Sequence, residues 1–456
     1  MPKNKFLIIP TLLFTIWMSQ PSEAALFAES LNTILPFGAT VGAPPTPIPA
    51  IPEWYQDFAA PGYGVGPNAG GLKIEFCNDG TAFCGMTDIP GGEGFWYAAD
   101  ADLSASIITG GLAQLRLNLE ATSDPTLPNF SRVRIRIDVP APGTYTITHP
   151  YGTQAFNVAT VGPGADINAT TDLLPPFLAT TPIGPYLFWD SGLPLTDPVT
   201  GGFYIGDATA PHKVLGSPTG NNFFRIEGPA GVDLNADPAI TSNILETNLF
   251  IVLGKVFTGD GNNAPALVND QDAALGLPYP TNPSMPIEID VLANDQFVDI
   301  PINPTSLTIS TAPAANAGTA QVVLVDGQKK IRFTPAASFT GAVSFAYTAS
   351  TFGGRAAPAP ATVNVFVEDL TLESAIFRPK LMKWSISGTS SDTAGNTISI
   401  HSGADMSGPV IGTATVQTDG SWKFVGKSMI SPGRSDKLSI VSSNGLSVTN
   451  VDIQQR

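Results

Sequence analysis

The side chains best suited to binding a metal ion lie in residues 233–237, where the sequence reads Asp-Leu-Asn-Ala-Asp. Oxygen donors at alternate positions suit Ca²⁺, which takes six to eight hard oxygen ligands. The segment departs from the common helix–loop–helix calcium motif, because a proline follows it and Ile244 stands where that motif has a glutamate. We predict calcium at Asp233, Asn235 and Asp237, with an ordinary turn as the alternative.

Trp and Tyr residues gather at three places in the first half of the chain: Trp54–Tyr55, Trp96–Tyr97 and Trp189. Exposed aromatic rings stack on sugar rings, which is a common means of binding glycans on β-rich proteins. The first pair lies in a polar segment flanked by proline, so it is the pair least expected to be wholly buried. We predict a glycan-binding surface at Trp54 and Tyr55; packing in the core is the alternative.

The histidines lie far apart. The chain has three, His149, His212 and His401, and none has the spacing of a helical metal pair. The run His149-Pro150-Tyr151-Gly152 ends a predicted strand, so His149 and Tyr151 are candidates to line a ligand site. A histidine that caps a turn is the alternative.

Catalytic chemistry has weaker support. Four carboxylates in the first half of the chain could serve a glycosidase, but nothing in their spacing pairs them: Glu53, Asp57, Glu75 and Glu120. The sequence has no Gly-x-Ser-x-Gly nucleophile turn and no phosphate-binding glycine loop. We expect a protein that is not an enzyme, with a glycoside-active amino-terminal domain as the alternative.

Composition and charge favour an exported β protein. Charged residues make up 13% of the 456 residues, and the chain is rich in Gly (45) and Pro (42), which suit short strands joined by turns. The net charge of −16 argues against nucleic-acid binding, which needs clustered Lys and Arg. The length predicts about three domains.

The amino terminus has the order of a secretory signal: basic Lys3 and Lys5, an apolar run from Phe6 to Met18, and small residues at and before Ala24. The run is too short to span a bilayer, and no longer apolar run follows. We predict a signal peptide over residues 1–24, no transmembrane segment after its removal, and a secreted or cell-surface protein.

Cys77 and Cys84 are the two cysteines, and an Asn-Asp-Gly turn sequence lies between them. An exported chain with one close pair most often forms a disulfide. The spacing is not the C-x-x-C of redox or metal sites, and no histidine lies nearby. We predict a structural disulfide.

Residues 25–258 predict a β-rich amino-terminal domain of sandwich or jelly-roll type. Residues 132–139 alternate charged residues with Val or Ile, as a half-buried antiparallel strand does. A turn sequence follows and residues 144–148 alternate again, so we predict a β-hairpin. Residues 250–257 predict a closing strand, and residues 105–120 predict either a short helix or a further strand.

Two smaller domains follow a polar, turn-rich linker, and we place them at residues 259–368 and 371–456. Residues 361–367 alternate as the last strand of a sandwich does. In both domains an Asp-Gly pair, at residues 326–327 and 419–420, lies between alternating segments, as a hairpin turn requires. We predict two related sandwiches in tandem.

The first of these two domains carries a motif combination with a known counterpart. Residues 289–295 read Ile-Asp-Val-Leu-Ala-Asn-Asp, and residues 333–341 read Phe-Thr-Pro-Ala-Ala-Ser-Phe-Thr-Gly. In this order they resemble the cadherin-like and immunoglobulin-like modules of bacterial surface proteins. Residues 384–389 and 419–424 resemble immunoglobulin-like modules more loosely. The resemblance implies β-sandwiches used as spacers, stalks and adhesive units.

The resemblance also implies calcium at Asp295. In this family, the Asn-Asp pair and another acidic residue two positions on supply oxygen ligands for the ion. Phe297 stands at that position, so the ligand set is incomplete. A second group of oxygen donors lies where such modules bind calcium between domains: Asp260, Asn262, Asp270 and Asp272.

These features predict an all-β, multidomain protein, with an amino-terminal sandwich-like domain followed by two immunoglobulin-like domains. We expect a non-catalytic secreted or cell-surface protein that presents its amino-terminal domain for adhesion or ligand binding. The ligand would be an extracellular glycan or a cell-surface protein. The alternatives are a carbohydrate-active enzyme with accessory modules and a purely structural spacer.

Overall fold

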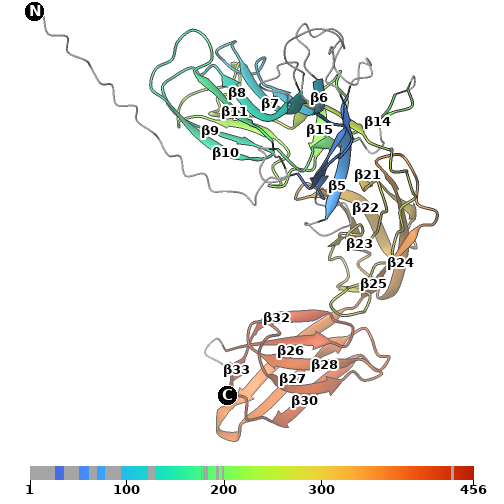
Figure 1. The fold of residues 1–456 in the computed structure, drawn as a ribbon. Coiled ribbons are helices and arrows are strands. Elements are labelled where there is room, and N and C mark those ends of the chain that lie inside the picture. The colour runs from blue at the N-terminus through green and yellow to red at the C-terminus, as the bar shows by residue number, and fades with distance from the viewer. Residues whose placement is uncertain are drawn as a thin grey trace, which may run out of the picture.

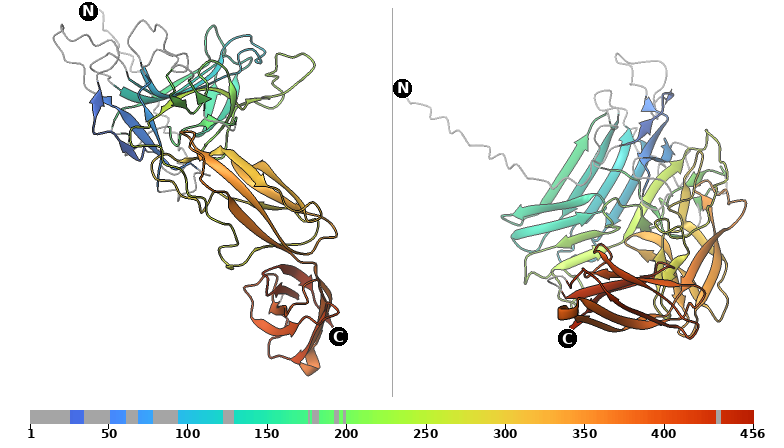
Figure 2. Two further views of the ribbon diagram at one scale, coloured as in Figure 1. Left: turned by 90° about the vertical axis from the view of Figure 1, so that its right-hand side faces the viewer. Right: turned by 90° about the horizontal axis from the view of Figure 1, so that it is seen from below.

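The computed structural model describes residues 26–34, 51–60, 69–77, 94–121, 129–175, 177, 183–191, 195–197, 200–432 and 436–456. Three β bodies follow one another in an elongated molecule, with the carboxyl end in the third (Figures 1 and 2). We call them the head (residues 26–256), the middle module (264–367) and the last module (370–456). In the described part of the chain, no helix is long and apolar enough to cross a membrane.

The head contains a large sheet whose main path runs β1-β4-β5-β18-β6-β7-β8-β11. Its strands are β1 (Ala28–Glu29), β4 (Trp54–Phe58), β5 (Gly70–Glu75), β6 (Gly94–Asp102), β7 (Ala113–Ala121), β8 (Asn129–Ile137), β11 (Ile167–Leu173) and β18 (Leu249–Val256). Short strands pair beside this path: β12 (Phe188–Trp189), β13 (Leu195–Thr196), β14 (Phe203–Tyr204) and β15 (His212–Leu215).

A second sheet of the head, in the order β10-β9-β16-β17, packs against the first. Its strands are β9 (Gly143–His149), β10 (Gly152–Val158), β16 (Phe224–Glu227) and β17 (Ile244–Thr247); β2 (Thr33–Ile34) and β3 (Ile51–Pro52) form a separate pair. Ile135 of the first sheet and Ile147 and Ile226 of the second belong to one buried cluster. The head is therefore a β-sandwich, as predicted.

The hairpin predicted from residues 132–148 is wrong in its pairing. Both strands exist as β8 and β9, but β8 pairs with β7 and β11, whereas β9 pairs with β10 and β16. The two prolines of the connection, Pro140 and Pro142, lack backbone N–H groups and so disfavour a tight ladder. The chain crosses from one sheet to the other there. Of the two alternatives for residues 105–120, the strand is right: β7 covers its second half.

The middle module is a sandwich of the sheets β19-β25-β24-β21 and β20-β23-β22 around its own core. Its strands are β19 (Tyr279–Thr281), β20 (Ile287–Ile289), β21 (Ile302–Thr311), β22 (Gly318–Val325), β23 (Gln328–Pro335), β24 (Gly341–Thr351) and β25 (Ala361–Val367). The predicted hairpin turn is confirmed: β22 and β23 pair directly across Asp326 and Gly327, which both have positive φ.

The last module is a sandwich of the sheets β30-β27-β26-β33 and β29-β28-β31-β32. Its elements are β26 (Leu370–Arg378), the 3-10 turn η2 (Pro379–Leu381), β27 (Lys383–Ser390), β28 (Thr397–Ser402), β29 (Val410–Thr415), β30 (Ser421–Lys427), β31 (Lys437–Ser442), β32 (Ser447–Asp452) and β33 (Gln454–Gln455). The second predicted hairpin is wrong, because β29 pairs with β28 and β30 with β27. Asp419–Gly420 therefore turns the chain from one sheet to the other.

The junction between the head and the middle module is largely apolar. Phe352 meets Phe188 edge-on with ring centroids 5.1 Å apart, and Ile300 and Phe352 belong to the buried cluster of the head. Lys329 also forms an ion pair with Asp190 across the junction, with 2.5 Å between Nζ and Oδ1. The middle module thus extends the core of the head.

The junction between the middle and last modules is built on Glu368. Its backbone N–H donates to Thr281 of the middle module, while its fully buried carboxylate accepts hydrogen bonds from the last module. The donors are Ser390 (2.7 Å), Asn396 (2.8 Å), Ser442 (2.6 Å) and Asn444 (3.4 Å). A buried carboxylate needs such partners, because leaving it unpaired in an apolar environment is costly.

Candidate functional site

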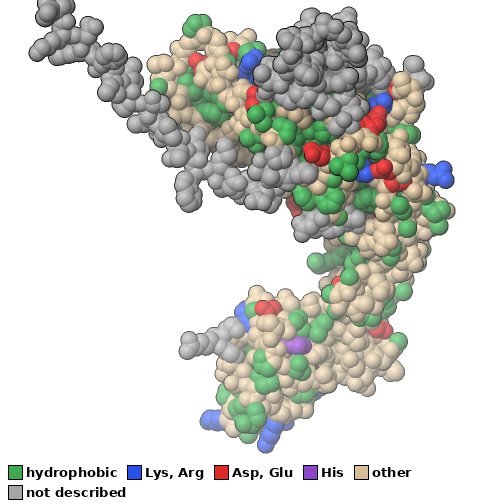
Figure 3. Space-filling view, in the orientation of Figure 1, with side chains coloured by type: hydrophobic (Ala, Val, Ile, Leu, Met, Phe, Trp, Pro, Cys, Tyr) green, Lys and Arg blue, Asp and Glu red, His purple; other side chains and the backbone are tan. Residues whose placement is uncertain are grey.

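Four arginines lie together on the outward face of the large sheet of the head, although charged side chains are sparse on the protein surface drawn in Figure 3. Arg132, Arg134 and Arg136 alternate along β8 with the buried Val133 and Ile135, so all three project from one side. Arg116 of β7 stands directly opposite Arg134 in the ladder. We call Arg116, Arg132, Arg134 and Arg136 the arginine face.

The end of the arginine face at Arg132 is neutralised. Its guanidinium binds the Asp172 carboxylate through two bonds of 2.6 and 2.7 Å, and it lies 3.7 Å from Glu120. It also stacks over the ring of Phe130, 4.4 Å from the centroid. Two carboxylates and a ring surround Arg132, so its charge is compensated within the protein.

Arg116 is neutralised in a similar way from the other side. Asp100 stands opposite it on β6, and the two form an ion pair with an Nη2–Oδ2 distance of 3.0 Å and an Nε–Oδ2 distance of 3.1 Å. Burial raises the pKa of Asp100, and the charge of Arg116 opposes that rise.

Arg134 and Arg136 differ from these neighbours. Across the strands described here, no Asp or Glu forms an ion pair with either of them, and the Nε of Arg134 is buried without a hydrogen-bond partner. Burial and three positive neighbours, Arg132, Arg136 and Arg116, lower the pKa of Arg134, and the charge of Glu120 only partly opposes them. At this end of the arginine face, two guanidinium groups therefore lie without a directly bound carboxylate among the described residues.

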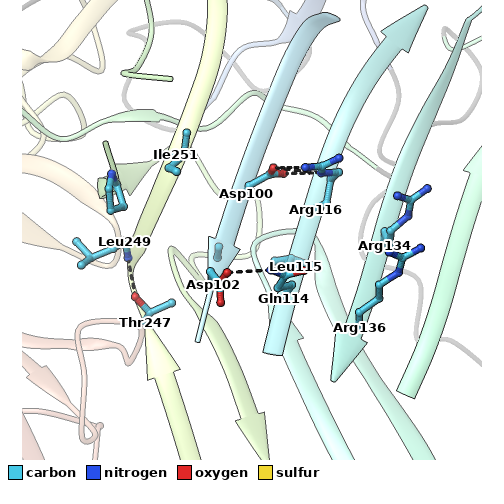
Figure 4. Close-up of a pocket in the computed structure, with 12 residues that line it drawn as sticks. Asp100, Asp102, Gln114, Leu115, Arg116, Arg134, Arg136, Thr247, Leu249 and Ile251 are labelled. Carbon is cyan, nitrogen blue, oxygen red and sulfur yellow. Dashed lines mark hydrogen bonds and ion pairs between the residues drawn. The ribbon is translucent and has the colours of Figure 1, made fainter. Parts of the chain in front are cut away.

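A groove of about 380 Å³ opens beside this charge (Figure 4). One wall carries the guanidinium groups of β7 and β8, and the other carries apolar side chains of β18 and its neighbourhood. Asp102 and Gln114, joined by a hydrogen bond of 2.9 Å, lie between the walls. The lining residues of the apolar wall include Leu249, Ile251 and Pro211. The groove can hold a ligand that is anionic on one edge and apolar on the other.

The aromatic pair predicted to bind glycan does not present two rings to solvent. Tyr55 is fully buried and accepts a hydrogen bond from Asn129, so the expectation that it is exposed is wrong. Trp54 is half-buried, packs against Phe257 and lies under the ammonium of Lys73. Alternation along β4 explains the difference, because successive side chains point to opposite faces of the sheet.

The other predicted ligand residues, His149 and Tyr151, lie inside the head. His149 is 2% exposed, and burial lowers its pKa to about 4, so its ring is neutral at pH 7. Its Nδ1 accepts the backbone N–H of Tyr151, whose hydroxyl donates to the carbonyl of Pro185 at 2.7 Å. Both side chains therefore form hydrogen bonds with the backbone of turns and loops inside the head.

In the predicted calcium segment, side-chain oxygens bind the backbone of the loop. Oδ1 of Asp233 accepts the N–H groups of Asn235 and Ser242, Oδ1 of Asn235 accepts that of Asp237, and Oδ1 of Asp237 accepts that of Ala239. Such capping is what Asp and Asn do in turns. Within the described residues, no three His, Cys, Asp or Glu side chains form a group that could hold a metal ion. Calcium binding here stays a prediction.

Asp295, also predicted to bind calcium, lies in a buried acidic cluster of the middle module. Its carboxylate accepts hydrogen bonds from the Tyr347 hydroxyl and the Val268 N–H, and burial raises its pKa to about 6. Burial, followed by the neighbouring charges of Asp295 and Asp290, raises the pKa of Asp270 to about 8. The cluster favours a bound proton at neutral pH.

The remaining predicted residues lie elsewhere. Cys77 is fully buried beside β6, and Cys84 lies outside the described residues, so their disulfide stays a prediction. The predicted signal peptide also lies outside them. Of the four carboxylates considered for a glycosidase, none lines the groove; Asp57 and Glu120 are buried, and Glu75 pairs with Lys255 at 2.9 Å.

The sequence predicts the strand at residues 132–139 and its charged face, but it does not mark that face as a site. The available signal was three arginines at alternate positions in a chain with few charges. An arginine of β8 lacks a bound carboxylate only if the strands beside it, β7 and β11, place no acidic residue opposite it. The sequence does not predict that β7 and β11 flank β8.

The comparisons with known proteins concern mainly the middle module. Residues 262–366 match the family model of a bacterial Ig domain. The middle module is a bacterial Ig domain. It holds the motifs at residues 289–295 and 333–341, so the predicted resemblance is confirmed for this Ig domain.

No curated protein matches the chain. Among solved structures, it is similar to the Escherichia coli adhesin FdeC (14% identity, 51% of this chain, 74% of that chain, TM-score 0.18) and the Yersinia pseudotuberculosis adhesin InvE (15%, 42%, 61% and 0.15). It is also similar to an endo-fucoidan hydrolase of glycoside hydrolase family 107 (15% identity, 43% of this chain, TM-score 0.18), of which it spans 35%. With TM-scores of 0.15 to 0.18, these similarities carry no information about the activity of this protein.

Proposed function

We propose that the protein is an exported, non-catalytic binding protein that presents its head to an extracellular ligand on two immunoglobulin-like modules. The observation that carries the proposal is the groove at Arg134 and Arg136, where two guanidinium groups without ion-pair partners face an apolar wall on the outward face of the head. The groove lies in the body farthest along the chain from the carboxyl end (Figure 1). A binding site suits that position, because the modules give it reach.

Three features support export and display. The amino-terminal sequence has the order of a secretory signal. The middle module matches the family model of a bacterial Ig domain. The apolar junction at Phe352 fixes the head to the middle module, so the head would be held at a defined orientation.

Fractionation of the source cells would test the location. We expect the chain in the medium or at the cell surface, with a mass that lacks residues 1–24. Recovery of the full-length chain from the cytoplasm would contradict export.

Binding of the mature chain to intact cells and to a panel of extracellular polysaccharides would test the function. We expect saturable binding, measured with calcium and with a chelator to test the predicted calcium dependence. Release of reducing sugar from any member of the panel would favour the carbohydrate-active enzyme instead. Absence of both binding and hydrolysis would leave the structural spacer.

A further inference from the structure

We infer that the groove beside Arg134 and Arg136 binds a carboxylated polysaccharide, that is, a glycan that contains uronic acid. This inference rests on the proposed function and names the ligand class of the same site. It follows from the pattern of charges across β6, β7, β8 and β11.

The neighbouring strands show how the protein itself satisfies an arginine on this face. Asp172 of β11 stands opposite Arg132 and binds it with both oxygens. Two and four residues earlier on β11, at the corresponding places, stand Thr170 opposite Arg134 and Asn168 opposite Arg136. Neither is a carboxylate. A carboxylate from a ligand would complete at Arg134 and Arg136 the pairing that Asp172 provides at Arg132.

The state of Arg134 gives a reason for a ligand to bind here. Its Nε is buried without a partner and it is surrounded by three other arginines. An anion in the groove would pair with the Arg134 guanidinium and reduce the repulsion among the guanidinium groups. A planar guanidinium fits a carboxylate through two parallel bonds, which also fixes the orientation of the sugar ring.

The opposite wall distinguishes a sugar acid from a bare anion. Leu249 and Ile251 are exposed apolar side chains, at 42% and 37%, and Pro211 lies beside them. The C–H face of a pyranose ring can cover such a wall while its carboxylate meets the arginines. Asp102 and Gln114 between the walls can bind hydroxyls.

Size and overall charge argue against larger partners. A groove of about 380 Å³ is at the small end of ligand sites, and it does not offer the roughly 800 Å² that each partner buries in a standard protein interface. Because the net charge is −16, an anionic glycan would be held only where the local positive site receives its carboxylates, so binding should weaken as salt screens that site.

Binding of the mature chain to immobilised polygalacturonate, a neutral polysaccharide and a sulfated polysaccharide would test the inference. The test variant is R134Q/R136Q, in which both guanidinium groups of the groove are removed. The matched controls are R225Q, a partly exposed arginine of the head paired with Glu246, and R332Q, an arginine of the middle module paired with Glu288. Thermal unfolding of each variant would report its folding.

We expect the double variant to lose polygalacturonate binding by at least about tenfold, the size of a lost charge-assisted pair, while each control stays within about twofold. Because the double variant removes repulsion within the arginine face, it should unfold at or above the wild-type temperature. Equal polygalacturonate binding by the wild type and the folded double variant would overturn the assignment of the groove.

Two further outcomes separate the inference from the proposed function. If the chain binds cells or the sulfated or neutral glycan but not polygalacturonate, the ligand class is wrong and the binding function stands. If it binds no glycan and no cells, both fail.

Discussion

The two junctions of this chain are built by different means. Between the head and the middle module, the Phe352 and Ile300 side chains complete the core of the neighbour, and one ion pair lies beside them. Between the middle and last modules, one buried carboxylate collects four hydrogen bonds. An apolar junction depends on how well many atoms pack, whereas a polar hub depends on a single side chain.

The difference indicates which neighbouring domains keep a fixed orientation relative to each other. Because the first junction extends a core, we expect the head and the middle module to unfold together and to keep one orientation. At the second junction, loss of Glu368 would leave buried donors without an acceptor, so a single substitution should release the last module.

Truncation of Phe352 should break the first junction and have the largest effect. Phe352→Ala removes the edge-on contact with Phe188 and leaves a cavity, which typically costs about 3–5 kcal/mol. We expect a lower unfolding temperature for the head and the middle module, and a broader distribution of distances in solution scattering. Val298→Ala, at a residue 77% exposed in the same module, is the control. An unchanged transition would show that the junction is not part of the core.

Removal of the Glu368 carboxylate should break the second junction. Glu368→Ala leaves the Ser390, Asn396 and Ser442 donors buried and unsatisfied, and we expect a loss of about 2–4 kcal/mol from the last module. Limited proteolysis should then cut between the modules. The control is Glu373→Ala, at an exposed glutamate of β26. If both variants resist the protease equally, the hub does not hold the junction.

Alkaline pH should weaken the middle module between the two junctions. The pKa of Asp270 rises from 3.8 to about 8 in the fold, so the folded state holds a proton that the unfolded state loses near pH 4. That stabilisation is complete below pH 4 and is lost as the pH rises to about 8. Asp270→Asn should therefore flatten the pH profile and gain at least about 1 kcal/mol over the wild type at pH 9, because each unit of raised pKa corresponds to about 1.4 kcal/mol.

Urea unfolding at pH 5, 7 and 9 would measure the effect of Asp270. Asp326→Asn, at the turn between β22 and β23, provides a carboxylate of the same module outside the cluster. A wild-type profile that does not fall between pH 5 and 9, or an Asp270→Asn variant with the same slope, would contradict the assignment of the proton.

Loss of the ion pair at the first junction should have the smallest effect. The Lys329 and Asp190 side chains are 20% and 16% exposed, and such pairs typically contribute at most about 1 kcal/mol. Lys329→Met should shift the unfolding temperature slightly and remove part of its salt dependence; Lys423→Met in the last module is the control. If Lys329→Met lowered the unfolding temperature as much as Phe352→Ala does, the ion pair would contribute as much to the junction as its apolar contacts.

The sequence predicted the strands better than it predicted their partners. The strands predicted at residues 250–257 and 361–367 correspond to β18 (Leu249–Val256) and β25, because alternation of apolar residues is a local property. The pairing of β8 and β30 was not predictable in the same way. Asp326-Gly327 and Asp419-Gly420 have the same turn residues, yet one closes a hairpin and the other joins two sheets. Only the packing of both sheets decides between them.

The candidate site was hidden for the same reason. Tyr55 and His149 stand out by residue type, and both are buried because their places in the strands face the core. Arg134 is one of three similar arginines in the sequence. It becomes distinctive once Thr170 rather than an acidic residue is found beside it, and that neighbour lies on a strand more than thirty residues later in the chain.

Strand β18 leads out of the head towards the two modules, and it lies in the interior of the large sheet, between β5 and β6. A pull on the carboxyl end while the head is bound would therefore run along the length of an internal strand. Ladder hydrogen bonds lie across the strand direction, so such a load would shear those on both sides of β18 together instead of opening them one at a time. Peeling, which breaks bonds in sequence, requires an edge strand such as β11. The head should therefore resist unfolding by a force applied along β18.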